Sequence, residues 1–244
     1  MRTLGLLGGM AWPSTLDAYR QLNEHVAARL GGHHSAELVL WSVDFARIET
    51  LQAAGDWEAA GALLADGAAR LERAGAQGLL LCTNTMHRVA PAIEAAVGIP
   101  LLHIADATAA RVLAAGHTRV GLLGTRFTME EPFYRERLED QGIEVVVPGD
   151  EDRHEVHRII YDELVHERIV ASSRASFVAI ADRLVAAGAQ GIIAGCTEIE
   201  LLLADGDLTV PLHPTTAIHV RAAVDWMLDT ADTRPDGMTP PRRP

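Results

Sequence analysis

The segments "AGAQGLLLCTNT" (Ala74–Thr85) and "AGAQGIIAGCTE" (Ala187–Glu198) repeat one pattern within a single chain. Each begins with the same five residues, continues as a short apolar run and then carries a cysteine followed by polar residues. The offset between the copies is 113 residues at their first residues but 114 between Cys82 and Cys196. These are the only two cysteines of the chain, so we interpret the repeat as a device that places two thiols.

Short apolar runs bounded by turn residues alternate with helical patterns along the chain. The runs of the first half are Thr3–Gly8, Glu37–Val43, Gly78–Cys82 and Ile99–Ile104, and those of the second half are Arg119–Thr125, Ile143–Pro148, Gly191–Cys196 and Thr209–His213. Strands that alternate with helices, twice over, predict an α/β fold. We expect two similar domains with parallel sheets flanked by helices, related by a pseudo-two-fold axis.

The series of runs also predicts domain boundaries. We expect a first domain of residues 1–104 with 214–230, a second domain of residues 105–213, and a flexible tail of residues 231–244. The last helical pattern, about Thr216–Leu228, is too short to build a third unit, so we expect it to pack on the first domain. The tail is rich in proline and arginine and has no periodicity.

The position of each cysteine after an apolar run suggests where a ligand binds. Ligands of open parallel sheets bind outside the carboxyl ends of the strands. Cys82 and Cys196 each follow such a run and precede a polar turn and a helical pattern. A helix N-terminus lowers the pKa of a nearby thiol and attracts a carboxylate. A buried cysteine is often inert, but the repeat favours two functional thiols in one interdomain cleft.

The composition excludes several classes of partner. The chain has 244 residues, of which 48% are hydrophobic and 22% charged, as in ordinary globular proteins. Its net charge of −12 argues against a nucleic-acid partner. No apolar stretch approaches the roughly 18–20 residues of a membrane span, and the first residues lack a secretory pattern. We therefore expect a cytoplasmic location with no membrane partner and with reduced thiols.

The residue types also argue against a cofactor. The chain contains no lysine, which a pyridoxal phosphate enzyme needs for its Schiff base. A structural disulfide is disfavoured in a reducing compartment, and the histidines show no zinc-ligand spacing. The segment "GLLGGM" (Gly5–Met10) matches neither common nucleotide-binding pattern. We expect no metal and no cofactor.

Two thiols on opposite sides of a cleft favour the inversion of a stereocentre. One group would remove a proton from one face of a carbon, and the other would deliver a proton to the opposite face. Free thiols titrate near pH 8.5, so a modest shift makes either a competent base. A nucleophilic hydrolase instead needs one nucleophile and a base. The pattern therefore predicts cofactor-independent racemisation or epimerisation.

Several motifs carry a resemblance to a known family. They include "GLLGGMAWPST" (Gly5–Thr15), "LCTNTMH" (Leu81–His87) and "AGCTEI" (Ala194–Ile199). Through them the chain resembles the aspartate/glutamate racemase superfamily, and within it the aspartate racemases and broad-specificity amino-acid racemases. The resemblance covers nearly the whole chain. It implies an interdomain active site, a two-thiol mechanism, an amino-acid substrate and a homodimer.

The resemblance also implies roles for individual residues. Cys82 and Cys196 match the two acid/base cysteines. The implied substrate-binding residues are Met10 and Gln52 in the pocket lining, Arg47 on a side-chain carboxylate, Thr125 in the second glycine-rich turn, and Thr83, Asn84, Thr85, Thr197 and Glu198 around the α-carboxylate and α-amino group.

The chain departs from the family pattern at two positions. Val165 stands where aspartate racemases place a lysine, and Pro214 stands where many relatives have an aspartate. The first departure weakens strict aspartate specificity, because Arg47 alone would hold the side-chain carboxylate. We therefore expect a substrate such as aspartate, glutamate or a similar small polar amino acid.

Other functions remain open on the sequence. Another two-cysteine relative, such as a hydantoin racemase or a cis-trans dicarboxylate isomerase, would share most of these motifs, and in the isomerase one cysteine would be a nucleophile. A two-lobed protein that binds an acidic amino acid without turnover is a contrasting class. The presence of both cysteines favours catalysis, since binding alone does not need them.

Overall fold

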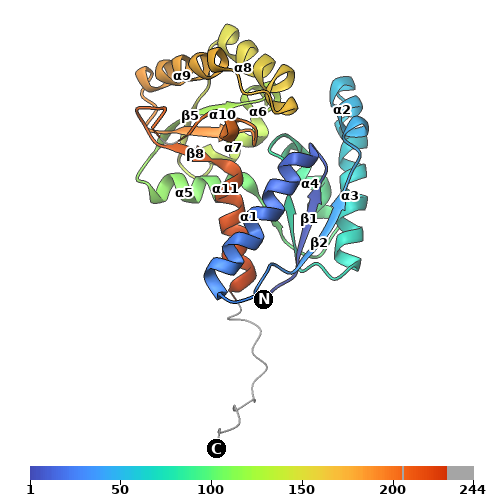
Figure 1. The fold of residues 1–244 in the computed structure, drawn as a ribbon. Helices are drawn as coiled ribbons and strands as arrows, with labels where there is room; N and C mark the ends of the chain where they lie inside the picture. The colour runs from blue at the N-terminus through green and yellow to red at the C-terminus, as the bar shows by residue number, and fades with distance from the viewer. Residues whose placement is uncertain (205, 230–244) are drawn as a thin grey trace, which may run out of the picture.

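The computed structural model describes residues 1–204 and 206–229, so the tail expected at residues 231–244 lies outside the described residues. Two four-stranded parallel sheets, each flanked by helices, form two lobes (Figure 1). The α/β fold expected from the sequence is confirmed, and each of the eight predicted apolar runs overlaps a strand.

The first sheet has the strand order β2-β1-β3-β4. Its strands are β1 (Leu4–Gly8), β2 (Leu38–Ser42), β3 (Gly78–Leu81) and β4 (Leu101–Leu102). Its helices are α1 (Trp12–Leu30), α2 (Phe45–Ala54), α3 (Trp57–Arg73) and α4 (Ala90–Ala95), with the 3₁₀ helix η1 (Thr85–Val89) before α4. The central strands β1 and β3 are buried throughout, as continuous apolar runs in a covered parallel sheet should be.

The second sheet repeats this topology as β6-β5-β7-β8. Its strands are β5 (Arg119–Gly124), β6 (Glu144–Val146), β7 (Ile192–Gly195) and β8 (Leu212–Pro214). Its helices are α5 (Ile104–Ala114), α6 (Arg126–Glu130), α7 (Pro132–Glu139), α8 (Asp150–Asp162), α9 (Ala171–Ala186) and α10 (Ile199–Leu202), with the 3₁₀ helix η2 (Leu164–His166) after α8.

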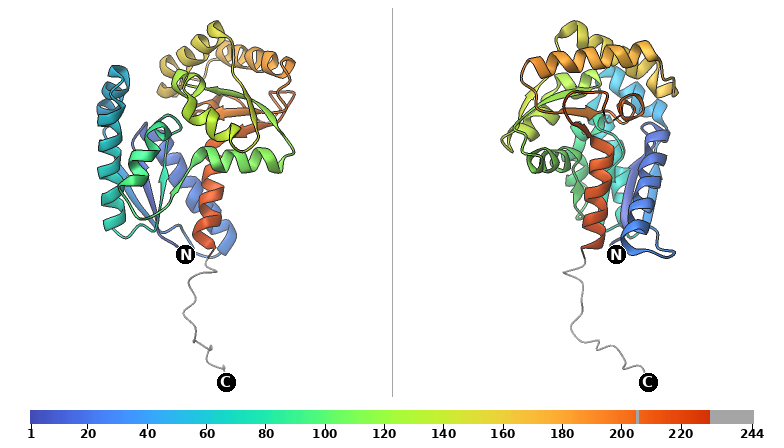
Figure 2. Two further views of the ribbon diagram at one scale, coloured as in Figure 1. Left: turned by 180° about the vertical axis from the view of Figure 1, so that it is seen from behind. Right: turned by 60° about the vertical axis from the view of Figure 1, so that its left-hand side comes forward.

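The last helix, α11 (Thr215–Leu228), leaves the second sheet and runs back along the first lobe beside α1 (Figure 2). Its buried residues Val220 and Val224 share an apolar cluster with Leu4 and Leu6 of β1. The backbone N–H of Arg2 donates to a carbonyl near the end of this helix. The helix that follows the second sheet therefore completes the core of the first.

The two sheets repeat one another in register. Leu7 of β1 pairs with Leu81 of β3, and Leu123 of β5 pairs with Ala194 of β7. Leu81 and Ala194 are 113 residues apart, which is the offset between the first residues of the two sequence copies. The extra residue of the second copy therefore lies after the matching positions Leu81 and Ala194.

A glycine on α3 allows that helix to pack on the first sheet. A Cβ atom at Gly67 would lie 2.5 Å from ring atoms of Trp41 and 2.9 Å from Leu7. Alanine favours an isolated helix over glycine by about 1 kcal/mol, but steric overlap of this kind costs about 1–3 kcal/mol. The close approach of helix and sheet therefore depends on the missing side chain.

We predict that Gly67→Ala lowers the free energy of unfolding by about 1–3 kcal/mol, because α3 must move away from β2. Urea denaturation followed by circular dichroism measures the change. Gly149→Ala is the control for an added methyl group without overlap, since no atom lies within 4 Å of its Cβ position, and it should lower the free energy by about 0.5 kcal/mol, because Gly149 is the N-cap of α8 and alanine caps less well than glycine. Equal effects of the two substitutions would contradict the packing argument.

Candidate active site

A cavity lies between the lobes, at the carboxyl ends of the central strands. The first lobe contributes Met10, Ala11, Phe45, Thr83, Asn84 and Thr85, and the second contributes Thr125, Ile160, Tyr161, Val165, Gly195, Cys196, Thr197 and Glu198. This is the place where open parallel sheets bind ligands.

Cys196 follows β7 directly and lines this cavity. Its Sγ donates a hydrogen bond to Oε2 of Glu198 at 2.8 Å. Burial and the adjacent Glu198 carboxylate raise the pKa of the Cys196 thiol well above its usual range. In the absence of ligand the thiol form is therefore favoured, with its proton directed at a carboxylate.

Thr83 holds the corresponding position in the first lobe. It lies two residues beyond Leu81, as Cys196 lies two residues beyond Ala194, and its side chain lines the same cavity. The carbonyl oxygen of Thr83 accepts a hydrogen bond from Nδ1 of His87 at 2.8 Å. A buried imidazole thus holds the turn that presents this hydroxyl group.

Cys82 differs from the expectation that it faces the cleft. It is absent from the cavity lining and packs in the apolar cluster of β1, α1 and α11, with Leu80. Successive side chains of a strand point to opposite faces, so Leu81 and Thr83 point one way and Leu80 and Cys82 the other. Burial raises the pKa of the Cys82 thiol to about 12. Cys82 instead borders a smaller adjoining hollow, together with Ser14, Thr83 and Thr197. The structure therefore brings Cys196, without Cys82, to the main cavity.

Hydroxyl and amide groups dominate the polar lining of the cavity. Oγ1 of Thr85 lies 3.2 Å from Oγ1 of Thr125 in the other lobe. Nδ2 of Asn84 donates to Thr215 at 3.0 Å, and its buried Oδ1 has no partner among the described residues. Glu198 is the one charged side chain among the lining residues. A substrate carboxylate bound here would be held by hydroxyl and N–H donors.

Comparison with known proteins shows the family to which this chain belongs. The family model described as Asp/Glu/Hydantoin racemase matches residues 7–223. The chain belongs to this family.

Solved structures agree with the assignment. A candidate Asp/Glu racemase from Yersinia pestis is 55% identical, with a TM-score of 0.89 over 93% of this chain and 100% of that chain. An aspartate racemase homologue from Pyrococcus horikoshii is 34% identical, with a TM-score of 0.82 over 93% and 99% of the two chains. The broad-specificity amino-acid racemase RacX of Bacillus subtilis is 25% identical over 170 residues, which are 67% of this chain and 70% of RacX. The protein is an isomerase of the racemase type.

The cavity of this racemase gathers most of the residues expected from the sequence, but not all. Those in its lining are Met10, Thr83, Asn84, Thr85, Thr125, Cys196, Thr197 and Glu198. Arg47 lies outside it, exposed in the first turn of α2 beside a separate surface hollow. Gln52 is buried below the cavity and its Nε2 donates to the sulfur of Met86 at 2.9 Å. Val165, which stands in place of a lysine, does line the cavity.

Two residues of the site have no signal in the sequence. Tyr161 comes from α8, where it belongs to an ordinary amphipathic pattern, and it reaches the cavity only through the packing of that helix. Ser14 comes from α1, and its hydroxyl contacts Thr197 at 2.7 Å and Glu198 at 2.9 Å in the other lobe. Contacts between lobes cannot be read from the pattern of either lobe alone.

Neither a metal site nor a membrane helix is found where the structure describes the chain. Among residues 1–204 and 206–229, no group of three His, Cys, Asp or Glu side chains is placed to hold a metal ion. Within the same ranges, every helix is too short or too polar to cross a bilayer.

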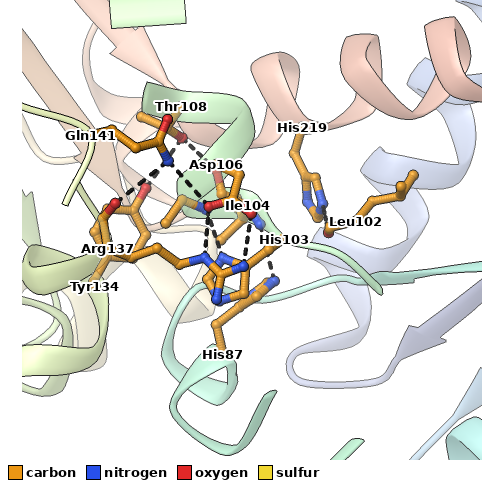
Figure 3. A network of polar contacts seen from close by, with 11 residues as sticks. His87, Leu102, His103, Ile104, Asp106, Thr108, Tyr134, Arg137, Gln141 and His219 are labelled. Atoms are coloured by element: carbon orange, nitrogen blue, oxygen red, sulfur yellow. Dashed lines mark hydrogen bonds and ion pairs between the residues drawn. The ribbon is translucent and has the colours of Figure 1, made fainter. Parts of the chain in front are cut away.

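Three buried histidines, His87, His103 and His219, lie close together beside the first lobe's turn, and His87 is the one that bonds to Thr83 (Figure 3 shows the three rings). The rings of His87 and His103 stack edge to face with centroids 4.5 Å apart, and His219 lies 5.8 Å from His87. Nε2 of His87 accepts the N–H of Ile104, which fixes a neutral tautomer that donates through Nδ1. Burial lowers the pKa of His87 well below its usual range, of His103 to about 3 and of His219 to about 4.

We predict that the free energy of unfolding falls in acid because of these histidines. Each stays neutral in the folded state, whereas the unfolded chain binds protons below its ordinary pKa of 6.5. Stability is thus fully present above about pH 6.5 and is lost at about 1.4 kcal/mol per pH unit per histidine as the pH falls toward the folded values. Urea unfolding between pH 7 and pH 5 measures the slope.

His219→Gln removes one titrating group and should make that slope shallower by about 1.4 kcal/mol per pH unit. The exposed His33 gives the matched control, and His33→Gln should leave the slope unchanged. A slope that is the same in His219→Gln as in the native chain would show that this imidazole is not kept neutral by the fold.

Proposed function

We propose that the protein racemises an amino acid without a cofactor, by proton transfer at opposite faces of Cα. The observation that carries the proposal is the equivalence of two positions. Cys196 and Thr83 each lie two residues beyond the matching positions Ala194 and Leu81 of matching sheets, and both line one cavity from opposite lobes. Inversion of a carbon needs two groups so arranged, and the names of the relatives support an amino acid as the substrate.

In this proposal Cys196 is the acid/base group of the second lobe. Its thiolate removes the Cα proton from one face, and as a thiol it returns a proton in the reverse direction. Thr83 provides the hydroxyl group at the opposite face. Its O–H bond breaks as the new C–H bond forms on the carbanion, and the oxygen then takes a proton from solvent water while the Cys196 thiol releases the proton it gained. Both groups thus return to their starting forms after each turnover, and the same transfers run backwards in the reverse direction. The sequence suggested Cys82 for this role, so an experiment must distinguish Cys82 from Thr83 as the proton donor of the first lobe.

The same lining supports a binding mode for the common part of an amino acid. Thr85 and Thr125, on opposite lobes, offer hydroxyl donors to the α-carboxylate. The carboxylate of Glu198 offers a partner to the α-ammonium group. Neutral donors around the carboxylate, and the single negative charge of the Cys196–Glu198 pair near the ammonium group, match the zwitterion without a fixed cation.

We propose aspartate, glutamate or a similar small polar amino acid as the substrate. Met10, Phe45 and Val165 form an apolar part of the cavity, which leaves room for a short side chain. Arg47 is the cation two residues from the lining residue Phe45, and we assign it to a side-chain carboxylate. We further propose a cytoplasmic homodimer, as the resemblance implies, and independence from pyridoxal phosphate, since the chain has no lysine.

We predict that Cys196→Ser and Thr83→Ala each reduce kcat for racemisation by about 10²–10⁴-fold, the usual contribution of a positioned acid or base. Cys82→Ala should stay within about threefold of the native rate, because its thiol points into the core. Chiral chromatography of L-aspartate, L-glutamate and L-homoserine measures inversion, and NMR in D₂O measures exchange at Cα.

The control for the first lobe is Thr83→Ser, which keeps the hydroxyl group and should keep most of the activity. Loss of activity in Cys82→Ala, with Thr83→Ala active, would assign the first-lobe role to the thiol. Binding without exchange or inversion of any of the three amino acids by the native protein would contradict the racemase and identify a binding protein.

We predict that Arg47→Ala lowers kcat/KM for an acidic substrate by about 10–100-fold, the value of one hydrogen bond to a charged group, and leaves neutral substrates nearly unchanged. Steady-state kinetics with L-glutamate and L-homoserine measure both. The control is Arg73→Ala at the end of α3, far along the chain from any lining residue. An equal loss on both substrates would place Arg47 in the scaffold or at the α-carboxylate.

A further inference from the structure

Three oxygen-bearing side chains form a closed ring beside Cys196. Oγ of Ser14 lies 2.7 Å from Oγ1 of Thr197 and 2.9 Å from Oε1 of Glu198. Oγ1 of Thr197 lies 2.7 Å from Oε2 of the same carboxyl group. Each of the three distances is that of an O–H···O hydrogen bond.

The ring could hold three O–H···O hydrogen bonds, but its two hydroxyl groups supply only two hydrogens. Ser14 and Thr197 carry one hydroxyl hydrogen each, but three oxygen pairs lie at hydrogen-bond distance. With an ionised Glu198, one of the three pairs is two oxygens without a hydrogen between them. With a proton on Oε2 of Glu198, that oxygen donates to Thr197, Thr197 donates to Ser14, and Ser14 donates to Oε1.

The group that supplies such a proton is the adjacent thiol. Sγ of Cys196 lies 2.8 Å from Oε2, the oxygen on which a proton completes the ring. We propose that Glu198 accepts the thiol proton of Cys196, and that Ser14, from the opposite lobe, is the positioning residue that stabilises the protonated carboxyl group. The S–H bond breaks, sulfur keeps its electron pair, and an O–H bond forms on Oε2. The inference rests on the proposed acid/base role of Cys196.

The charges around the ring favour transfer within the pair over release of the proton to solvent. Glu200 of α10 and the phenol of Tyr161 on α8 both interact with the Cys196 thiol. Asp17, Arg20 and Glu167 line the adjoining outer hollow, which Thr197 and Glu198 also border. A second negative charge among these carboxylates is unfavourable, whereas transfer from Cys196 to Glu198 leaves the total charge unchanged.

Ser14 makes the proton transfer from Cys196 to Glu198 depend on contact between the lobes. It lies in the first turn of α1 and is buried, and its hydroxyl group hydrogen-bonds to Thr197 and Glu198 of the second lobe. If the lobes separate, the ring loses one of its three members and the protonated carboxyl loses a donor. A reactive thiolate is thereby favoured when the cavity is closed.

The test is the rate of alkylation of Cys196 by iodoacetamide without substrate, followed by mass spectrometry of the peptides between pH 6 and pH 8. A thiol that loses its proton to solvent reacts about tenfold faster per pH unit below its pKa. Internal transfer makes the reactive fraction independent of pH, so we expect a change of less than about threefold over this range in the native protein. Glu198→Gln removes the acceptor and should restore the steep dependence.

Ser14→Ala should slow alkylation of Cys196 at pH 7 by about fivefold, the value of one hydrogen bond between uncharged groups. Ser14→Thr keeps a hydroxyl group and should restore the rate to within about threefold. Thr197→Val and Thr197→Ser form a second pair with the same expected contrast. Cys82 reports on folding in every sample, because its alkylation is slow unless the protein unfolds.

A steep pH dependence in the native protein would overturn the role of Glu198 as proton acceptor. An unchanged or faster rate in Ser14→Ala, with Cys82 still protected, would overturn the role of Ser14. Because no substrate is present, either result is separate from the racemase assay. Absence of racemisation with the expected alkylation pattern would contradict only the proposed function.

Discussion

The alternation of side chains along β3 and β7 decides which atoms the cavity receives. These strands are central in their sheets, so the face toward which each residue points is fixed by pairing with β1 and β5. Leu81 and Thr83 fall on one face and Cys82 on the other, where α1 and α11 cover it. A shift of one residue in β3 would replace the hydroxyl group of Thr83 at the cavity by the thiol of Cys82.

Contacts across the cavity are made mainly by hydroxyl groups. Thr85 meets Thr125, and Ser14 meets Thr197, in each case from opposite lobes. A hydroxyl group rotates to donate or to accept, so one set of side chains serves more than one arrangement of a ligand. This property suits a site that must hold both mirror forms of one molecule, which differ in where the hydrogen and the side chain lie.

The sequence predicted the fold well because its signals are local. Apolar runs gave eight strands, and the repeated segments gave the duplication and the position of Cys196. The sequence repeat suggests that Cys82 corresponds to Cys196, although these residues are 114 apart. The strand register keeps an offset of 113 residues, and this offset pairs Cys196 with Thr83 instead. Ser14 and Tyr161 join the site only through contacts between distant segments, and such contacts leave no periodic pattern in the sequence.

The path of α11 has a consequence for the order in which the chain can fold during synthesis. Domains generally form as units from the N-terminus onward. Here the cluster around Leu4 and Leu6 needs Val220 and Val224 of α11, which the ribosome adds only after the whole second lobe. That face of the first sheet therefore has only α1 to cover it while the second lobe is being synthesised. The first lobe therefore begins to form before the second lobe, but its core is completed only after the second lobe has been synthesised.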